Sequence, residues 1–266
     1  MWRKNAPTLE QILTWTTDSA QIALKMQNEN IEMHYKAANE LVTAADSAVE
    51  AMLIEKIQAH FPDHSINAEE SGDHDLGSDH KWYIDPIDGT LNYSHGMPIW
   101  AVSVAYAYKG ELIFGVICNP AMNETFWAAK GQGAFLNGER IQVSTVELFR
   151  DSLLITGFRQ YLIGTPKSNV NNFVRLSSEV QTIRRLGSAA LDLAYVACGR
   201  AEAFWEIDLN PWDVAAGILI VREAGGIVDS LYGDGELLTG KIDILSANPL
   251  IFPKMRTILL EERAKL

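Results

Sequence analysis

Residues 81–93, K-W-Y-I-D-P-I-D-G-T-L-N-Y, constrain the fold of this chain more than any other stretch. The aromatic and β-branched residues at 82–84 predict a buried strand. Pro86 should end that strand, because proline has no N–H to donate to a neighbouring strand. Asp85 and Asp88 would then lie at its carboxyl end. The sequence therefore predicts a buried strand that presents two carboxylates at one edge of a sheet.

The residues around these acids could complete a binding site. Ile87 offers a free backbone carbonyl, Gly89 can adopt conformations that other residues avoid, and Thr90 suits the N-cap of a following helix. Such oxygen atoms and helix-start amides can together bind a cation and a phosphate. The alternative is a simple turn, because the dipeptides that contain Asp85 and Asp88, Asp-Pro and Asp-Gly, are common in turns.

Composition limits the remaining classes of function. The 266 residues are 47% apolar, enough for a sizeable core in one large domain or two modest ones. The formal net charge of −12 argues against binding to nucleic acid or to an anionic membrane. The two cysteines, Cys118 and Cys198, indicate a reducing compartment without disulfides. No apolar run approaches the ~20 residues of a membrane span, so we expect a soluble, cytoplasmic protein.

The first part of the chain mixes helices with a β-rich region. Apolar spacing predicts helices over residues 8–28 and 44–60. Residues 100–108 and 111–118 are typical of two strands joined by a tight turn at Lys109-Gly110. Both segments are apolar on both faces, so this hairpin should lie in the middle of a covered sheet.

Strands alternate with helices in the second part, although residues 159–178 show no readable pattern. We therefore expect an α/β protein, an α+β layered sandwich in which helix and sheet layers alternate. The expected division is an N-terminal α+β half, residues 1–148, and a C-terminal α/β half, residues 149–266.

Further acids lie where predicted strands end and predicted helices begin. Glu69 and Glu70 follow a short apolar strand and could return to meet Asp85, although adjacent glutamates are also typical of a solvated loop. Asp46 lies three residues after Thr43, which is the spacing of a capping box, so its role could be purely structural.

The second half adds three candidate elements. Gly187-Ser188-Ala189-Ala190 opens a helix whose amides could face an anion or a sugar hydroxyl, or whose small residues could simply allow close packing. Glu206 lies on the predicted strand 201–207. Asp213 lies in the first turn of the helix begun by N-P-W-D-V-A-A-G, where the helix dipole alone would stabilise it.

Four of these acids form a set of hard ligands: Glu69, Asp85, Asp88 and Asp213. Four carboxylates cannot share one pocket unless cations offset their charge. Ligation by oxygen alone, with no His or Cys, points to Mg²⁺ rather than to zinc. Two such ions would bring the set near neutrality and leave room for a phosphate and a water.

The motifs W-Y-I-D-P-I-D-G-T, A-E-E-S and W-D-V-A-A-G resemble, in order and spacing, the inositol monophosphatase family of Mg²⁺-dependent, lithium-sensitive phosphomonoesterases. L-V-T-A-A-D and R-L-G-S-A-A also match, and the resemblance spans about residues 41–226. It implies the layered fold shared with fructose-1,6-bisphosphatases, a small-molecule phosphate monoester as the substrate, two or three Mg²⁺ per active site, and a homodimer.

The resemblance also implies a ligand set. One Mg²⁺ would be held by Glu69, Asp85 and the carbonyl of Ile87, and a second by Asp85, Asp88 and Asp213. Asp85 would bridge the two ions.

Catalytic and substrate-binding roles are implied in the same way. Thr90, hydrogen-bonded towards Asp46, would orient and help to deprotonate a metal-activated water, and Glu70 would support the ligands. The residues that would hold the phosphate or the inositol ring are Gly89, Thr90, Gly187, Ser188, Ala189 and Glu206.

The favoured function is hydrolysis of a myo-inositol monophosphate to inositol and phosphate. The nearest alternative keeps this chemistry on another small ester: a 3′-phosphonucleotide, fructose 1,6-bisphosphate or histidinol phosphate. A different class of function also stays open, a non-catalytic metal-binding interaction protein of the same fold.

Overall fold

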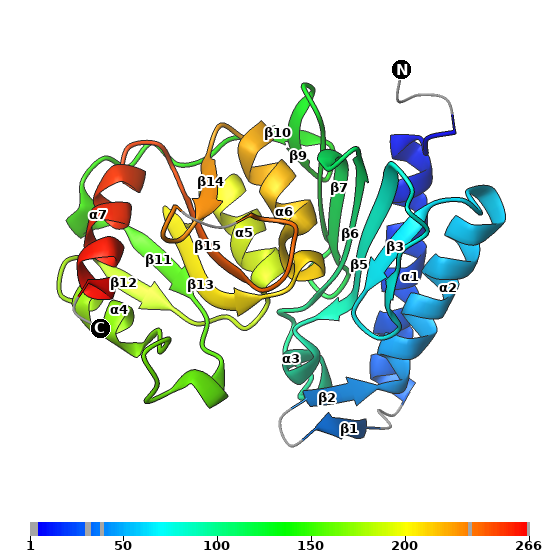
Figure 1. The fold of residues 1–266 in the computed structure, drawn as a ribbon, viewed down its shortest axis with the longest axis horizontal. Helices are drawn as coiled ribbons and strands as arrows, with labels where there is room; N and C mark the ends of the chain where they lie inside the picture. Colours follow the sequence, from blue (N-terminus) through cyan, green and yellow to red (C-terminus); the bar gives the residue numbers. More distant parts are fainter. Residues whose placement is uncertain (1–4, 30–32, 38–39, 234–235, 265–266) are drawn as a thin grey trace.

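The computed structural model describes residues 5–29, 33–37, 40–233 and 236–264. Helices and sheets alternate across the molecule, from α1 and α2 at one side to α4 and α7 at the other (Figure 1). The expected layered α/β architecture is therefore confirmed.

The large sheet contains eight strands in the order β10-β9-β8-β7-β6-β5-β3-β4. All neighbouring strands in it are antiparallel except β3 and β5, which are parallel. Its strands are β3 (Ser65–Ala68), β4 (Gly72–His74), β5 (His80–Asp88), β6 (Ala101–Tyr108), β7 (Glu111–Asn119), β8 (Glu124–Ala129), β9 (Gly133–Leu136) and β10 (Glu139–Ile141). As predicted, β6 and β7 form a hairpin in the middle of the sheet and are buried along almost their whole length.

Helices α1 (Leu9–Glu29) and α2 (Ala44–His60) cover one face of this sheet (Figure 1). Their apolar side chains, including Ile12 and Val49, join a buried core with Trp82 of β5. Both helices match the predicted ranges. A short hairpin of β1 (Met33–Ala37) and β2 (Glu40–Thr43) leads into α2.

Helices α5 (Ala189–Ala197) and α6 (Pro211–Glu223) lie between the two sheets (Figure 1). The small residues of α6 bring it close to its neighbours. A Cβ added at Gly217 would approach Leu193 of α5 to 2.5 Å, and one added at Gly115 of β7 would approach the Ala216 carbonyl to 2.8 Å. The two halves of the chain are therefore closely packed around the site described below.

The second sheet has the strand order β12-β11-β13-β15-β14, and β11 is parallel to both of its neighbours. Its strands are β11 (Leu153–Thr156), β12 (Thr182–Arg184), β13 (Ala203–Leu209), β14 (Ile227–Ser230) and β15 (Ile242–Ala247). Helices α4 (Val170–Ser177) and α7 (Phe252–Arg263) cover its outer face (Figure 1). Single-turn 3₁₀ helices lie at Phe149–Asp151 and Gln160–Leu162.

The division of the chain into two halves between residues 148 and 149 stays a proposal.

Two local predictions were wrong. Strand β5 does not end before Pro86 but continues to Asp88, because the pairing with β6 shifts register between Asp85 and Asp88 and leaves the proline outside the ladder. Thr90 is not an N-cap: Gly89 takes that position, with a left-handed backbone, and Thr90 is the first residue of α3 (Thr90–Ser94).

Among the described residues, no helix has both the length and the apolar content needed to cross a membrane.

Candidate active site

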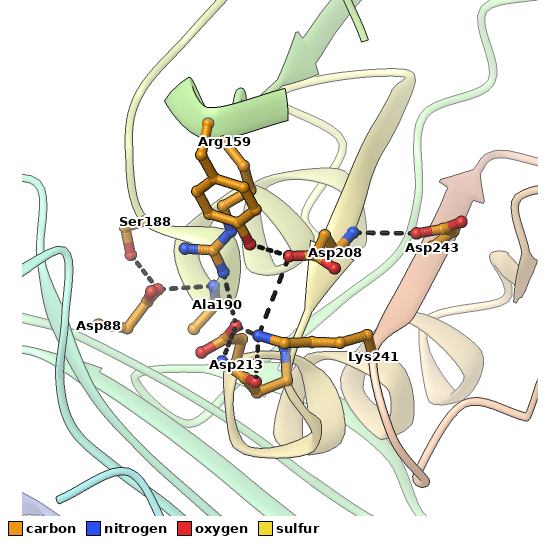
Figure 2. Close-up of polar contacts among 10 residues, drawn as sticks. Asp88, Arg159, Ser188, Ala190, Asp208, Asp213, Lys241 and Asp243 are labelled. Carbon is orange, nitrogen blue, oxygen red and sulfur yellow. Dashed lines mark hydrogen bonds and ion pairs between the residues drawn. The ribbon is translucent and has the colours of Figure 1, made fainter. Parts of the chain in front are cut away.

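Asp88, the last residue of β5, connects the large sheet to the N-terminus of α5. Its carboxylate accepts hydrogen bonds from the Ser188 hydroxyl and from the Ala190 N–H, the latter at 2.7 Å (Figure 2). Ser188 is the N-cap of α5. The sequence predicted that these helix-start amides could face an anion, and in this structure the anion is the Asp88 side chain.

Four predicted metal ligands, Glu69, Asp85, Asp88 and Asp213, come close enough for their charges to interact. Burial, followed by the charge of Asp213, raises the pKa of Asp88 to about 7. Burial, and then the charges of Glu69, Asp88 and Asp213, raise the pKa of Asp85 well above its usual range. Burial and the charge of Asp213 do the same to the pKa of Glu69. The four acids therefore lie close enough for their charges to interact, and their roles as metal ligands stay a prediction.

Asp46 has the capping role that the sequence offered as an alternative, and it also faces the site. Its carboxylate accepts hydrogen bonds from the backbone N–H of Thr43, at 2.8 Å, and from the Thr43 hydroxyl. Its other oxygen lies 3.3 Å from the hydroxyl of Thr90, which also lies 3.0 Å from the carbonyl of Ile87. Burial is the main cause that raises the pKa of Asp46 to about 6. The two interpretations of Asp46 are thus compatible.

A second acidic group lies next to Asp46. Carboxylate oxygens of Asp46, Glu69 and Glu70 all lie within 4.8 Å of one another. The resemblance placed only Glu69 of these three among the metal ligands, so the structure adds a possible oxygen cluster beside the expected one. The loop that carries it is held by Glu50 of α2, whose carboxylate accepts the N–H groups of Glu70 and Ser71, both at 2.8 Å.

The donor set fits a hard divalent cation. Asp85 is almost fully buried, and its Oδ1 has no hydrogen-bond partner among the residues that the structure describes. A buried carboxylate oxygen without a partner is costly, and a cation would remove that cost. All the predicted side-chain ligands supply oxygen, which suits Mg²⁺.

Asp213 lies in the first turn of α6, and it contacts a cation that the sequence did not lead us to expect. One carboxylate oxygen accepts the backbone N–H of Asn210 at 2.8 Å and a guanidinium N–H of Arg159 at 3.2 Å (Figure 2). Burial raises the pKa of Asp213, and the charge of Arg159 opposes this shift.

Glu206 of β13 is buried on the same side of the site. Burial raises its pKa to about 7, Arg159 opposes the shift, and Asp213 and Asp88 add to it. A Cβ added at Gly157 would overlap the Glu206 carboxylate, at 2.1 Å, so the missing side chain at residue 157 leaves the space that Glu206 occupies.

The two predicted glycines of the site pack against each other's loops. Gly89 and Gly187 have φ values of 94° and 90°, a region that favours glycine. A Cβ added at Gly89 would approach the Ile99 carbonyl to 3.0 Å and the Gly187 carbonyl to 3.2 Å. The side-chain amide of Asn92 closes this contact by donating to the carbonyls of Ile99 and Leu186, at 2.7 and 2.8 Å.

Sequence analysis missed Glu50, Arg159 and Asp192. Glu50 follows Asp46 by four residues on α2, so helical periodicity could have found it. Asp192 of α5 is fully buried, with an unpartnered Oδ1, and burial followed by the charges of Glu206 and Asp88 raises its pKa. Arg159 lies in the segment without a readable pattern, so no local signal pointed to it.

These features define a class: an α/β protein with a buried, carboxylate-rich site between two sheets, suited to a hard divalent cation. The sequence profile of the inositol monophosphatase family matches residues 6–264, and the chain belongs to that family. The family is Mg²⁺-dependent in general.

Similar proteins carry two kinds of name. The chain is 43% identical over 235 residues to Nus factor SuhB of Salmonella typhimurium, a match that covers 87% of each chain. It is 47% identical over 208 residues to an inositol-1-monophosphatase of Synechocystis, covering 77% of this chain and 72% of the relative. Its structure is similar to that of the inositol monophosphatase from Anabaena, with a TM-score of 0.82, 39% identity, and 95% and 96% of the two chains covered.

Proposed function

We propose that this protein hydrolyses a small phosphate monoester, with inositol monophosphate as the favoured substrate, in a reaction that depends on Mg²⁺. The observation that carries the proposal is the buried Asp85, whose Oδ1 lacks a partner while Glu69, Asp88 and Asp213 surround it with like charge. Such a site needs a cation to be stable when ionised. Membership of the inositol monophosphatase family supports the choice of substrate class.

The metal-binding part of the proposal uses the ligands expected from the resemblance. Glu69, Asp85 and the carbonyl of Ile87 would hold one ion, and Asp85, Asp88 and Asp213 a second. When bound, Mg²⁺ would neutralise the carboxylates, make a water molecule more acidic and offset the charge of the phosphate.

The remaining steps fall to the chain's own groups. The Thr90 hydroxyl would accept a proton from the attacking water. At the same time it would donate its own proton to the carboxylate of Asp46, which lies 3.3 Å away. Glu70 would support this arrangement from the adjacent cluster. The water oxygen would then attack phosphorus in line with the leaving alkoxide, so that a new P–O bond forms as the ester P–O bond breaks. The alkoxide would take up a proton from solvent and depart as the alcohol, and Asp46 would return its proton to solvent. Positioning and charge neutralisation supply most of the catalysis in such transfers.

The substrate-binding part of the proposal involves both halves of the chain. The N–H groups of Gly89 and Thr90 would hold phosphate oxygens, and Glu206 would accept hydrogen bonds from ring hydroxyls. Contacts to the ring would also come from Gly187, Ser188 and Ala189. The nearness of the Gly89 and Gly187 loops supports a single pocket that holds both parts of the ester.

The test is phosphate release by the purified protein with Mg²⁺ from inositol 1-phosphate, a 3′-phosphonucleotide, fructose 1,6-bisphosphate and histidinol phosphate. The proposal expects inositol 1-phosphate to give the highest kcat/KM. A clear preference for another ester would replace the substrate but keep the chemistry. No release from any of them, with Mg²⁺ shown to be bound, would overturn the enzymatic proposal.

The name of the Salmonella relative, a Nus factor, favours a second candidate. In that case the fold would bind metal and act through its surface on a partner, without turnover. Asp88→Asn separates the two functions, because the variant should lose catalysis by orders of magnitude while partner binding should survive.

A cytoplasmic location and a homodimer are also part of this proposal. Cys118 and Cys198 are free thiols, which supports a reducing compartment. Sedimentation equilibrium of the purified protein would test the dimer directly.

A further inference from the structure

Arg159 brings a permanent positive charge to the predicted metal site. Its guanidinium donates to Asp213 Oδ2 at 3.2 Å, and Asp213 is almost fully buried (Figure 2). The side chain of Arg159 is one-third exposed, but its Nε is buried and has no hydrogen-bond partner within the described part of the chain. An arginine stays protonated at all pH values that a folded protein tolerates. Asp213 is therefore already paired with a cation when no metal is bound.

The loop that carries Arg159 is attached to the site on both sides. Before it, Gly157 packs directly against the Glu206 carboxylate. After it, the Tyr161 hydroxyl donates to Asp208, a residue of β13. These two contacts keep the guanidinium close to the carboxylate of Asp213.

The other cation near Asp213 is held differently. The Lys241 ammonium donates to the side chain of Asn210 at 2.8 Å, and its side chain is 55% exposed. Lys241 therefore acts on Asp213 only at a distance and through solvent, which weakens charge interactions. Arg159 makes the direct contact.

A divalent cation and a guanidinium that share one carboxylate repel each other. Arg159 and Asn210 both contact Oδ2 of Asp213, so a metal could bind through Oδ1 or displace the guanidinium from Oδ2. In either case the repulsion between the two cations is subtracted from the free energy of metal binding. Removal of the guanidinium should therefore tighten metal binding, because the site becomes more negative.

We propose that Arg159 is an internal counter-cation that competes with the divalent metal for Asp213 and so lowers the metal affinity of this site. The proposal rests on the metal dependence of the proposed function. Arg159 would act on the metal through Asp213, and so set the metal concentration at which the site is filled.

The experiment measures Mn²⁺ binding to protein stripped with a chelator, using electron paramagnetic resonance and titration calorimetry. Arg159→Gln should bind the metal that contacts Asp213 about tenfold more tightly than the wild type, a change of ~1.4 kcal/mol. Arg150→Gln removes a charge from an arginine whose side chain is 80% exposed and should leave the affinity unchanged. Lys241→Gln should raise the affinity for Mn²⁺ less than Arg159→Gln does. Arg159→Lys, which keeps the charge, should bind Mn²⁺ almost as weakly as the wild type.

A double-mutant cycle locates the effect. In an Asp213→Asn background the carboxylate that Arg159 pairs with is gone, so Arg159→Gln should then change Mn²⁺ affinity by less than twofold. Circular dichroism of each variant establishes that it is folded. Arg159→Met, which also removes the charge and should tighten Mn²⁺ binding to a similar extent, gives a second measurement if the glutamine variant does not fold.

Equal or weaker Mn²⁺ binding by folded Arg159→Gln would overturn the inference, as would an equal gain in Arg150→Gln. Metal binding that follows the expected order while no ester is hydrolysed would overturn the proposed enzymatic function alone. No binding of Mn²⁺ to any of the proteins would overturn both.

Discussion

The carboxylate of Asp88, at the end of β5, accepts the N–H of Ala190 at the start of α5, 102 residues further along the chain, at 2.7 Å. The large sheet and the helices of the second half therefore meet at a polar contact in addition to the apolar core that they share. Because burial and Asp213 together raise the pKa of Asp88 to about 7, the same contact lies in a strongly acidic environment.

Asp88→Asn should remove activity but not stability. The amide oxygen can still accept from Ser188 and Ala190, while one negative charge leaves the cluster. In a chelator, we expect a melting temperature equal to or above that of the wild type, and the stabilisation by Mg²⁺ should largely disappear. Thermal melts with and without Mg²⁺ measure this. Asp151→Asn, at an exposed site, is the control, and marked destabilisation of Asp88→Asn in chelator would contradict the prediction.

Without metal, the protein should become less stable as the pH rises. The pKa values of Asp46, Asp88 and Glu206 are raised in the folded state, chiefly by burial, to about 6, 7 and 7, from ordinary values of 3.8, 3.8 and 4.5. Between the two sets of values the folded protein binds more protons than the unfolded chain, so the free energy of unfolding falls with increasing pH.

The range from pH 6.5 to 8 gives the clearest measurement. His64 has its pKa lowered to about 4, chiefly by burial, so it adds the opposite slope, but only between pH 4 and 6.5. Urea unfolding at pH 6.5, 7 and 8 in a chelator should show a decreasing stability that saturating Mg²⁺ removes. A stability that rises over this range in chelator would contradict the raised pKa values of these three carboxyl groups.

Glu50→Gln should loosen the loop that carries Glu69 and Glu70. Its two carboxylate oxygens accept the N–H groups of Glu70 and Ser71, and glutamine can satisfy only one of them without turning a donor towards the other. We expect a loss of about 1 kcal/mol in the free energy of unfolding. The kcat should fall by roughly tenfold, because misplaced groups position the reaction poorly. Glu55→Gln, an exposed change on the same helix, is the matched control for both measurements.

Gly89→Ala should be more harmful than Gly131→Ala. Both glycines have positive φ, 94° and 74°, so both substitutions are strained, but only the Cβ at Gly89 would meet neighbouring atoms, at 3.0 and 3.2 Å. The difference between the variants should therefore be about 1 kcal/mol or more in the free energy of unfolding. Equal losses in denaturant unfolding would mean that the Gly89 and Gly187 loops separate easily.

The local patterns were predictable for physical reasons that act over a few residues. Apolar spacing identified α1 and α2, and the two-sided apolar character of β6 and β7 predicted their place inside the sheet. The capping geometry of Thr43 and Asp46 was also encoded locally. The predicted end of β5 at Pro86 was wrong, because a register shift can place a proline outside the ladder without ending the strand.

The sequence by itself determined which acids, glycines and helix starts were available, because motifs of this kind are set by spacing along the chain. Only the tertiary structure decided what each carboxylate contacts: Asp88 faces α5, Glu50 holds the loop of Glu70, and Arg159 pairs with Asp213. Those contacts join residues 20 to 102 positions apart. The energy of interaction between two charges depends on their separation in space, so their separation along the sequence does not predict it. These residues come together only when the two sheets pack around α5 and α6.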